Sequence, residues 1–195
     1  MAETILVNRG TCYACAVACK REVEVKELGV TPKFGGPEYE TLAASGSYRI
    51  REVLDSGAGA VYRTNYLLQA PDRARWHLDT GSGTTDTIFV GEDRYTRDGT
   101  GPWKKETTPG LALSYPARNW TDQEGNVVVL GAARIGSTPV RVLAFIDLAN
   151  GAYHRLWVDR ANLILRERMH APGHFMDRDY FDYGAAVTIT PPATP

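Results

Sequence analysis

From residue 48 onward the chain consists of short runs in which apolar and polar residues alternate, and this period of two is typical of half-buried β-strands. In the most regular run, Ala74, Trp76 and Leu78 alternate with charged and histidine side chains. Stretches rich in Gly, Pro, Asp and Asn separate the runs and indicate turns. The predicted strands are residues 48–55, 60–70, 73–79, 85–90, 94–97, 103–107, 126–135, 139–147, 153–159, 163–170 and 175–183, with a last run at residues 186–190.

The connections between these runs are too short to hold crossover helices, so we expect antiparallel rather than parallel pairing. A sheet of about ten or eleven strands does not stay flat, because strand twist accumulates across it. The fold class is therefore predicted to be mainly β, a curled antiparallel sheet forming a half-open barrel. One face is expected to be apolar and the other solvated, although the alternation weakens in the last strand. There the apolar side is predicted to carry Phe175, Phe181 and Tyr183, opposite Met176, Arg178, Tyr180 and Asp182.

The composition of the chain changes near residue 46. The preceding stretch holds three cysteines, an alternating run at residues 22–27 that is predicted to be a short exposed strand, and a short helix at residues 37–44. Pro37 suits the first turn of that helix and Gly46 suits its C-terminal cap. Two regions follow from this boundary: an N-terminal cysteine-bearing segment, residues 1–46, and a half-barrel domain, residues 47–195.

The three cysteines, Cys12, Cys15 and Cys19, have a spacing that suits ligands of one metal ion or cluster, and the chain has no other cysteine. A closed zinc site or a cubane iron–sulfur cluster takes four protein ligands, so one ligand is missing. The same spacing places the three residues on one stripe of a helix, where small buried side chains would also fit. Both interpretations remain open on spacing alone.

Two motifs carry a resemblance over residues 3–46. The sequence GTCYACAVACKR at residues 10–21, followed by GGPEYETLAA at residues 35–44, resembles the aldehyde ferredoxin oxidoreductases, which are tungsten enzymes with a pterin cofactor. The resemblance implies that the three cysteines are three of the four ligands of a 4Fe–4S cluster. The fourth ligand would then come from a redox partner, a second copy of the chain or a non-cysteine group. The tungstopterin-binding β domain of that family has no counterpart here, so the segment alone would be an incomplete enzyme.

Composition restricts the partners and the location. With 43% hydrophobic and 23% charged residues, the 195-residue chain has the composition of a soluble globular protein. The formal net charge of −1 gives no electrostatic argument for a nucleic-acid partner. No apolar run approaches the length of a transmembrane segment, and the N-terminus lacks the basic and apolar regions of a signal peptide. We therefore expect a cytoplasmic protein, and the spacing of the cysteines also suits a reducing compartment.

A second resemblance covers residues 46–195. Its elements are SYRIRE at residues 47–52, YLLQAPDRARW at residues 66–76, FVGEDRY at residues 89–95, WKKE at residues 103–106, LWVD at residues 156–159, FDYG at residues 181–184 and VTITPP at residues 187–192. This order resembles the LolA/LolB and LprG/LppX superfamily of lipoprotein and lipid carriers. The resemblance implies an extracytoplasmic half-closed barrel that binds acyl chains without catalysis and without a cofactor.

The longest stretch between predicted strands, residues 108–120, is rich in apolar side chains and is predicted to form a plug or lid over the curled sheet. The candidate ligand-binding residues are Trp76, Leu111, Leu113, Tyr115 and Trp120. No nucleophile elbow and no phosphate-binding glycine loop is visible, so no catalytic residue is predicted.

Three functions follow. The first is noncatalytic binding of a hydrophobic ligand, such as an acyl chain, a lipid or a lipoprotein, in the half-barrel. The second is an iron–sulfur element related to aldehyde ferredoxin oxidoreductase that takes part in electron transfer. The third is a structural or interaction β domain with no ligand. The junction of two dissimilar resemblances also suggests a gene fusion or a gene-boundary error.

Overall fold

The computed structural model describes residues 37–110, 112–113, 115–116, 124–148 and 150–193. The predicted strand at residues 22–27 lies outside them. In the described part of the chain, no helix is long and apolar enough to cross a membrane. The elements are α2 (Pro37–Ala44), β1 (Ser47–Asp55), β2 (Val61–Gln69), β3 (Arg73–Asp79), β4 (Thr84–Val90), β5 (Asp93–Asp98), β6 (Lys104–Thr107), β7 (Glu124–Ile135), β8 (Thr138–Asp147), β9 (Tyr153–Val158), β10 (Ile164–Ala171) and β11 (His174–Phe181).

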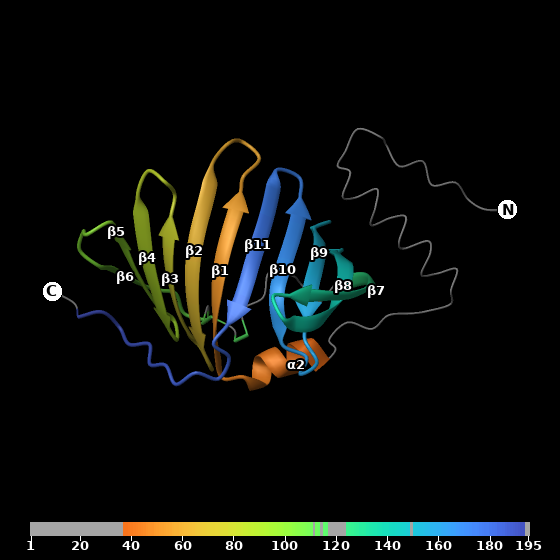
Figure 1. Ribbon diagram of the computed structural model, residues 1–195. Coiled ribbons are helices and arrows are strands. Elements are labelled where there is room, and N and C mark those ends of the chain that lie inside the picture. Colours follow the sequence, from red (N-terminus) through yellow and green to blue (C-terminus); the bar gives the residue numbers. More distant parts are fainter. Residues whose placement is uncertain (1–36, 111, 114, 117–123, 149, 194–195) are drawn as a thin grey trace.

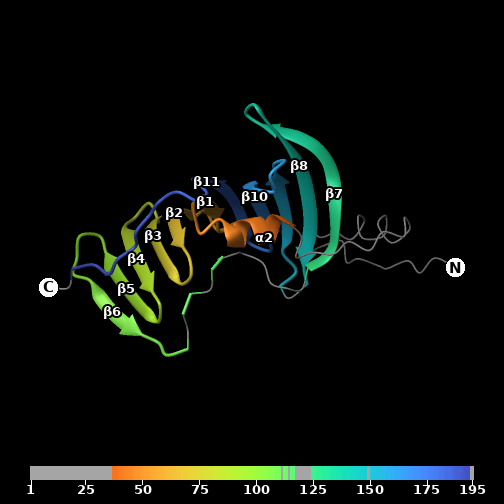
Figure 2. The ribbon, with the colours of Figure 1, turned by 90° about the horizontal axis from the view of Figure 1, so that it is seen from below.

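The eleven strands form one antiparallel sheet in the order β6-β5-β4-β3-β2-β1-β11-β10-β9-β8-β7. Strands β1 to β6 form one meander and β7 to β11 form another, and the two meet where β1 pairs with β11. The sheet curls without closing, so β6 and β7 are its two free edges (Figures 1 and 2). The predicted half-open antiparallel barrel is confirmed, and the eleven predicted strands begin and end within about two residues of the observed ones.

The helix α2 lies within the concave side of the sheet, at the end where β1 begins (Figure 2). It spans the predicted residues, and Gly46, at φ 72°, adopts the left-handed conformation that ends many helices. Leu42 is 1% exposed and joins Tyr48 and Ile50 in the main hydrophobic core. The buried carboxylate of Glu38 accepts a hydrogen bond from Arg141 of β8, which ties the helix to the far half of the sheet.

Strand register assigns side chains to the two faces. On β1 the residues that share the face of Tyr48 and Ile50 turn toward α2, and this is the concave face. The residues opposite them lie on the convex face. The buried members of the main core come from both halves of the sheet: Leu42, Tyr48, Ile50, Leu68, Ala74, Leu143, Phe145, Leu156, Val158, Ile164 and Tyr180.

The run at residues 186–190 is not a strand, so that prediction was wrong. The segment instead lies extended across the convex face. Ile189 is 3% exposed and packs with Ile88 and Tyr95. Its backbone N–H donates to Gln69 Oε1 at 2.9 Å, and its carbonyl accepts from Arg73 at 2.7 Å. Side chains have thus replaced a neighbouring strand as the partners of this alternating segment.

The assignment of faces in the last strand was also wrong. On β11, Met176 and Tyr180 are buried, whereas Phe175 is 45% exposed. Arg178 lies between the two buried residues on the concave face, because Glu52 of β1 is its partner across the strand pair. A prediction from alternating polarity assigns an arginine to the solvent-facing side of a strand. Here an acidic partner on the next strand allows it to face inward.

Candidate ligand-binding face

The end of the concave face next to α2 is an aromatic floor centred on Tyr48. The Tyr48 ring stacks on Tyr180 and Tyr183 at centroid distances of 6.1 and 5.9 Å, and it contacts Tyr115 at 5.6 Å. Tyr48 itself has no exposed surface. Tyr183 lies just past β11 and follows Asp182, which has a φ of 54°. The Tyr183 hydroxyl donates to the carbonyl of Ile164. This floor joins the helix, the centre of the sheet and the β6–β7 connection.

The β6–β7 connection reaches the floor because it links the two opposite edges of the sheet. Of the predicted lid residues, Leu113 and Tyr115 are half-buried and pack against the main core. The Tyr115 hydroxyl lies 2.8 Å from Ser45 Oγ and 3.3 Å from the Leu42 carbonyl, so it is fixed to the end of α2. Leu111 and Trp120 lie outside the described residues.

A row of aromatic side chains continues the concave face across β2, β3 and β4. Trp76, the other predicted binding residue, contacts Tyr66 at a centroid distance of 5.6 Å and Phe89 at 4.6 Å. All three rings are only partly buried. By register, the half-buried Leu54, Tyr62 and Leu78 lie on the same face, farther from α2. This aromatic wall is therefore apolar surface that remains accessible to a ligand.

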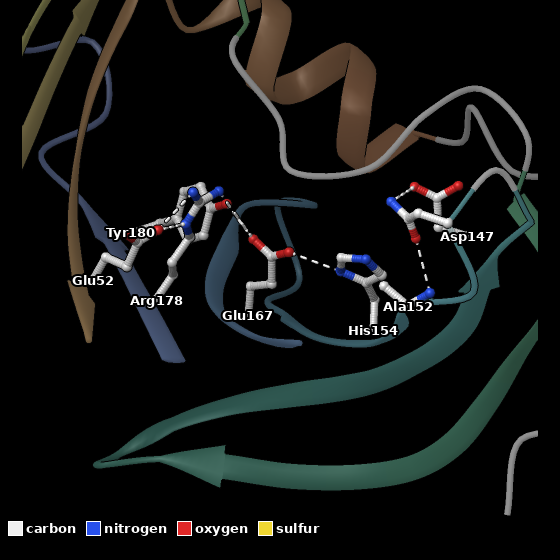
Figure 3. Close-up of polar contacts among 8 residues, drawn as sticks. Glu52, Asp147, Ala152, His154, Glu167, Arg178 and Tyr180 are labelled. Atoms are coloured by element: carbon white, nitrogen blue, oxygen red, sulfur yellow. Dashed lines mark hydrogen bonds and ion pairs between the residues drawn. The ribbon is translucent and has the colours of Figure 1, made fainter. Parts of the chain in front are cut away.

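A buried polar row lies on the concave face, farther from α2 than Tyr48 and Tyr180. It crosses four adjacent strands through Glu52 of β1, Arg178 of β11, Glu167 of β10 and His154 of β9 (Figure 3). Arg178 donates to Glu52 Oε2 at 2.7 Å and lies 3.7 Å from Glu167 Oε2. His154 Nδ1 lies 2.9 Å from Glu167 Oε1, and the Tyr180 hydroxyl donates to Glu167 Oε2 at 2.7 Å.

Every carboxylate oxygen in this row accepts a hydrogen bond, since Glu52 Oε1 receives the Tyr66 hydroxyl at 3.0 Å. Burial alone would raise the pKa of Glu167, but the hydrogen bond with His154 and the charge of Arg178 lower it below its ordinary value of 4.5. Burial and the Glu167 charge hold the pKa of Tyr180 well above its usual range, and burial with the Glu52 charge raises the pKa of Tyr66 to about 12. The two tyrosines thus stay neutral and donate their hydroxyl hydrogens to Glu52 and Glu167.

Sequence reasoning missed this row entirely. Its signal is present in the strand pattern, because each member occupies an inward position among apolar neighbours. The pairing that makes such positions acceptable is visible only once β1 and β11 are known to be adjacent. Since every carboxylate oxygen of the row accepts a hydrogen bond from another buried or half-buried side chain, the row acts as a support for the sheet, and the aromatic wall is left as partly exposed apolar surface.

Cys12, Cys15 and Cys19 lie outside the described residues. Within the described ranges, no group of three or more His, Cys, Asp or Glu side chains is arranged to hold a metal ion.

Comparisons with known proteins bear on both regions. The family model for aldehyde ferredoxin oxidoreductase, domains 2 and 3, matches residues 1–67, and it confirms the resemblance seen in the cysteine and GGPEYETLAA motifs. No curated protein matches the chain significantly.

Solved structures match the half-barrel. Lipoprotein LppX from Mycobacterium tuberculosis has a TM-score of 0.54 at 9% identity, over 92% of this chain and 100% of that one. An uncharacterized conserved protein from Thermus thermophilus has a TM-score of 0.50 at 8% identity, over 76% and 87% of the two chains. LprF from Mycobacterium bovis has a TM-score of 0.49 at 13% identity, over 80% and 95%. The match to LppX confirms the predicted LprG/LppX resemblance at the level of the fold.

Proposed function

We propose that the half-barrel binds a hydrophobic ligand, an acyl chain or the lipid part of a lipoprotein, on its concave face without catalysing a reaction. The observation that carries this proposal is the aromatic wall, in which Tyr66, Trp76 and Phe89 stay partly exposed on the concave side of a sheet whose floor is filled. Its similarity in fold to a mycobacterial lipoprotein supports the same proposal.

The physical basis is burial of apolar surface. Each methylene that an acyl chain buries contributes about 0.8 kcal/mol, so ten buried methylenes contribute about 8 kcal/mol before the cost of ordering the chain is subtracted. Flat aromatic side chains suit an acyl chain because they offer a large contact area and lose little conformational freedom. The wall contains three of them, with Trp76 in contact with both Tyr66 and Phe89. The polar row offers the chain no open carboxylate, since each carboxylate oxygen already accepts a hydrogen bond.

A brominated acyl chain tests this placement, because bromine quenches tryptophan fluorescence only at short range. Titration with dibromostearic acid is expected to quench the wild-type protein, and Trp76→Phe is expected to remove most of the ligand-dependent quenching while binding is retained. Trp157→Phe is the matched control, since Trp157 pairs with Arg166 on the convex face. Equal loss of quenching in the two variants would place the chain elsewhere, and no quenching of the wild type would favour a β domain without a ligand.

The N-terminal segment supports a second candidate function. The family-model match over residues 1–67 includes Cys12, Cys15 and Cys19, three thiolates at a spacing that iron–sulfur clusters use. We propose that they are three ligands of a 4Fe–4S cluster whose fourth ligand comes from a redox partner, a second copy of the chain or a non-cysteine group. In that case the half-barrel would serve as a docking scaffold for electron transfer.

Iron analysis of protein purified without oxygen separates the two candidates. If the cluster forms, the wild type carries iron and acid-labile sulfide, and Cys12→Ser is expected to lower the iron content at least about fivefold, because only two thiolates remain. Native mass spectrometry of the same sample reports a bound lipid directly. Iron content that is unchanged by Cys12→Ser would exclude the cysteines as ligands.

A further inference from the structure

The convex face carries a shallow depression of about 300 Å³ over strands β1, β2 and β3. It is lined by Arg49, Asn65, Leu67, Arg75 and His77, together with Tyr66, whose ring belongs to the aromatic wall on the opposite face. The register places Arg49 and Arg75 on either side of Leu67, and Asn65 next to His77 one row away. Arginine side chains therefore border an apolar base on two sides, while amide and imidazole groups border a third.

The charges around this depression are unevenly paired. Arg49 lies 3.2 Å from the carboxylate of Asp182. His77 lies 2.9 Å from Asp86, whose other oxygen pairs with Arg97 at 2.7 Å. Arg75 is exposed, and in the described residues it has no acidic partner. Its neighbours across the two strand pairs are Leu67 and Ile88, so no carboxylate stands directly opposite it.

The hydrogen bond with Asp86 also orients His77. The Asp86 carboxylate accepts the hydrogen bond from His77 Nδ1 and so fixes the imidazole. Arg97 in turn holds this buried carboxylate in place. Asp86 is 6% exposed, and the burial that would raise its pKa is outweighed by these hydrogen bonds, so its pKa is lowered and it remains ionised. The His77 side of the depression is thus held in a fixed orientation, although the depression itself is open to solvent.

We propose that this depression binds a phosphoryl group, either from a lipid headgroup or from a soluble phosphate ester. The planar guanidinium of Arg75 matches two phosphate oxygens through parallel N–H donors, and Arg49 adds a second positive charge across Leu67. Asn65 and His77 supply further polar groups beside them. The apolar base at Leu67 accommodates the carbon atoms attached to the phosphate. The face is opposite the aromatic wall, so this site and the hydrophobic ligand do not compete.

Calorimetric titration of the full chain with inorganic phosphate, together with cosedimentation on phosphatidylglycerol vesicles, tests the site. Arg75→Gln is expected to weaken the interaction at least about tenfold, since hydrogen bonds to a charged group are lost. Arg75→Lys keeps the positive charge but loses the two parallel N–H donors of the guanidinium. Its affinity for both probes is expected to lie between those of the wild type and Arg75→Gln. Binding of phosphate alone identifies a soluble ligand, whereas binding of phosphatidylglycerol but not phosphatidylcholine vesicles identifies a headgroup; both support the site.

Arg63→Gln is the matched control. Arg63 is an exposed arginine on the same face of β2, but it does not line the depression. The Arg63→Gln protein should therefore bind phosphate and vesicles as the wild type does. The proposal is overturned if the wild type binds neither probe, or if Arg63→Gln weakens binding as much as Arg75→Gln, because a general surface charge would then explain the result.

Discussion

Replacing Arg178 with methionine is expected to lower the free energy of unfolding by about 3–5 kcal/mol, because it leaves two buried carboxylates without their shared cation. Glu167 is fully buried and Glu52 is 5% exposed, so water cannot replace the lost guanidinium. Chemical denaturation followed by circular dichroism measures the effect. The matched control is Arg168→Met, which breaks the exposed 2.6 Å pair with Asp177 and should cost less than about 1 kcal/mol. An equal loss of unfolding free energy in Arg178→Met and Arg168→Met would show that the buried row does not stabilise the sheet.

The cost of Arg178→Met should also depend on pH. The pKa of Glu167 is lowered in the folded protein, so its contribution to stability is present above its ordinary value of 4.5 and is lost as the pH falls. Removing the Arg178 charge raises the pKa of Glu167. Once Glu167 is protonated it carries no charge, so the loss of the guanidinium no longer destabilises it. The difference in unfolding free energy between wild type and variant should therefore be largest at about pH 7 and smaller at about pH 3. A difference that is constant with pH would contradict the assignment of Arg178 as the cation that keeps Glu167 ionised.

Replacing Leu113 with glutamate is expected to abolish copurification of lipid with the half-barrel. Leu113 packs against the main core from the β6–β7 connection, so a carboxylate at this position would lift the connection from the floor or charge the surface that an acyl chain contacts. Quantitative lipid extraction and native mass spectrometry of the purified variant measure occupancy. Full occupancy in a folded Leu113→Glu protein would rule out this segment as part of the binding face.

The adjacent residue provides the control. Ala112 is exposed, so Ala112→Glu introduces the same charge one position away without entering the core. It should retain the lipid of the wild type. Because Leu113→Glu can also destabilise the domain, Leu113→Met serves as a second variant that keeps the apolar contact at similar volume. Lipid retained by Leu113→Met and Ala112→Glu, but lost from a folded Leu113→Glu, assigns the effect to the apolar contact at this position.

The strands could be predicted because each is a local event. Alternation on β3 assigns Ala74, Trp76 and Leu78 to one face, and turn residues mark its ends, so neither conclusion depends on distant parts of the chain. The helix α2 follows likewise from Pro37 and Gly46. The curl of the sheet follows from the number of strands. Local pattern and tertiary structure agree in all of these elements.

Two features were beyond local reasoning for the same physical reason. The inward position of Arg178 depends on Glu52, and the position of the segment around Ile189 depends on Gln69 and Arg73. In each case the partner lies more than a hundred residues away in sequence, so only the fold reveals it. Of the five predicted binding residues, Leu111 and Trp120 lie outside the described residues, and the structure places Trp76, Leu113 and Tyr115 on the concave face and its floor. Their role in binding a ligand stays a prediction.

The pairing of β1 with β11 has a consequence for how the domain assembles. Each meander is a series of neighbouring hairpins that can form as the chain emerges, but the central seam joins Glu52 to Arg178 across 126 positions. Closing so long a loop is entropically costly and raises the contact order, so the seam should form last and limit the folding rate. Until it forms, the two halves of the sheet expose the edges of β1 and β11. The stacking of Tyr48 of β1 on Tyr180 of β11 is therefore absent from any shorter intermediate, and the floor is completed only after the final strand has been added.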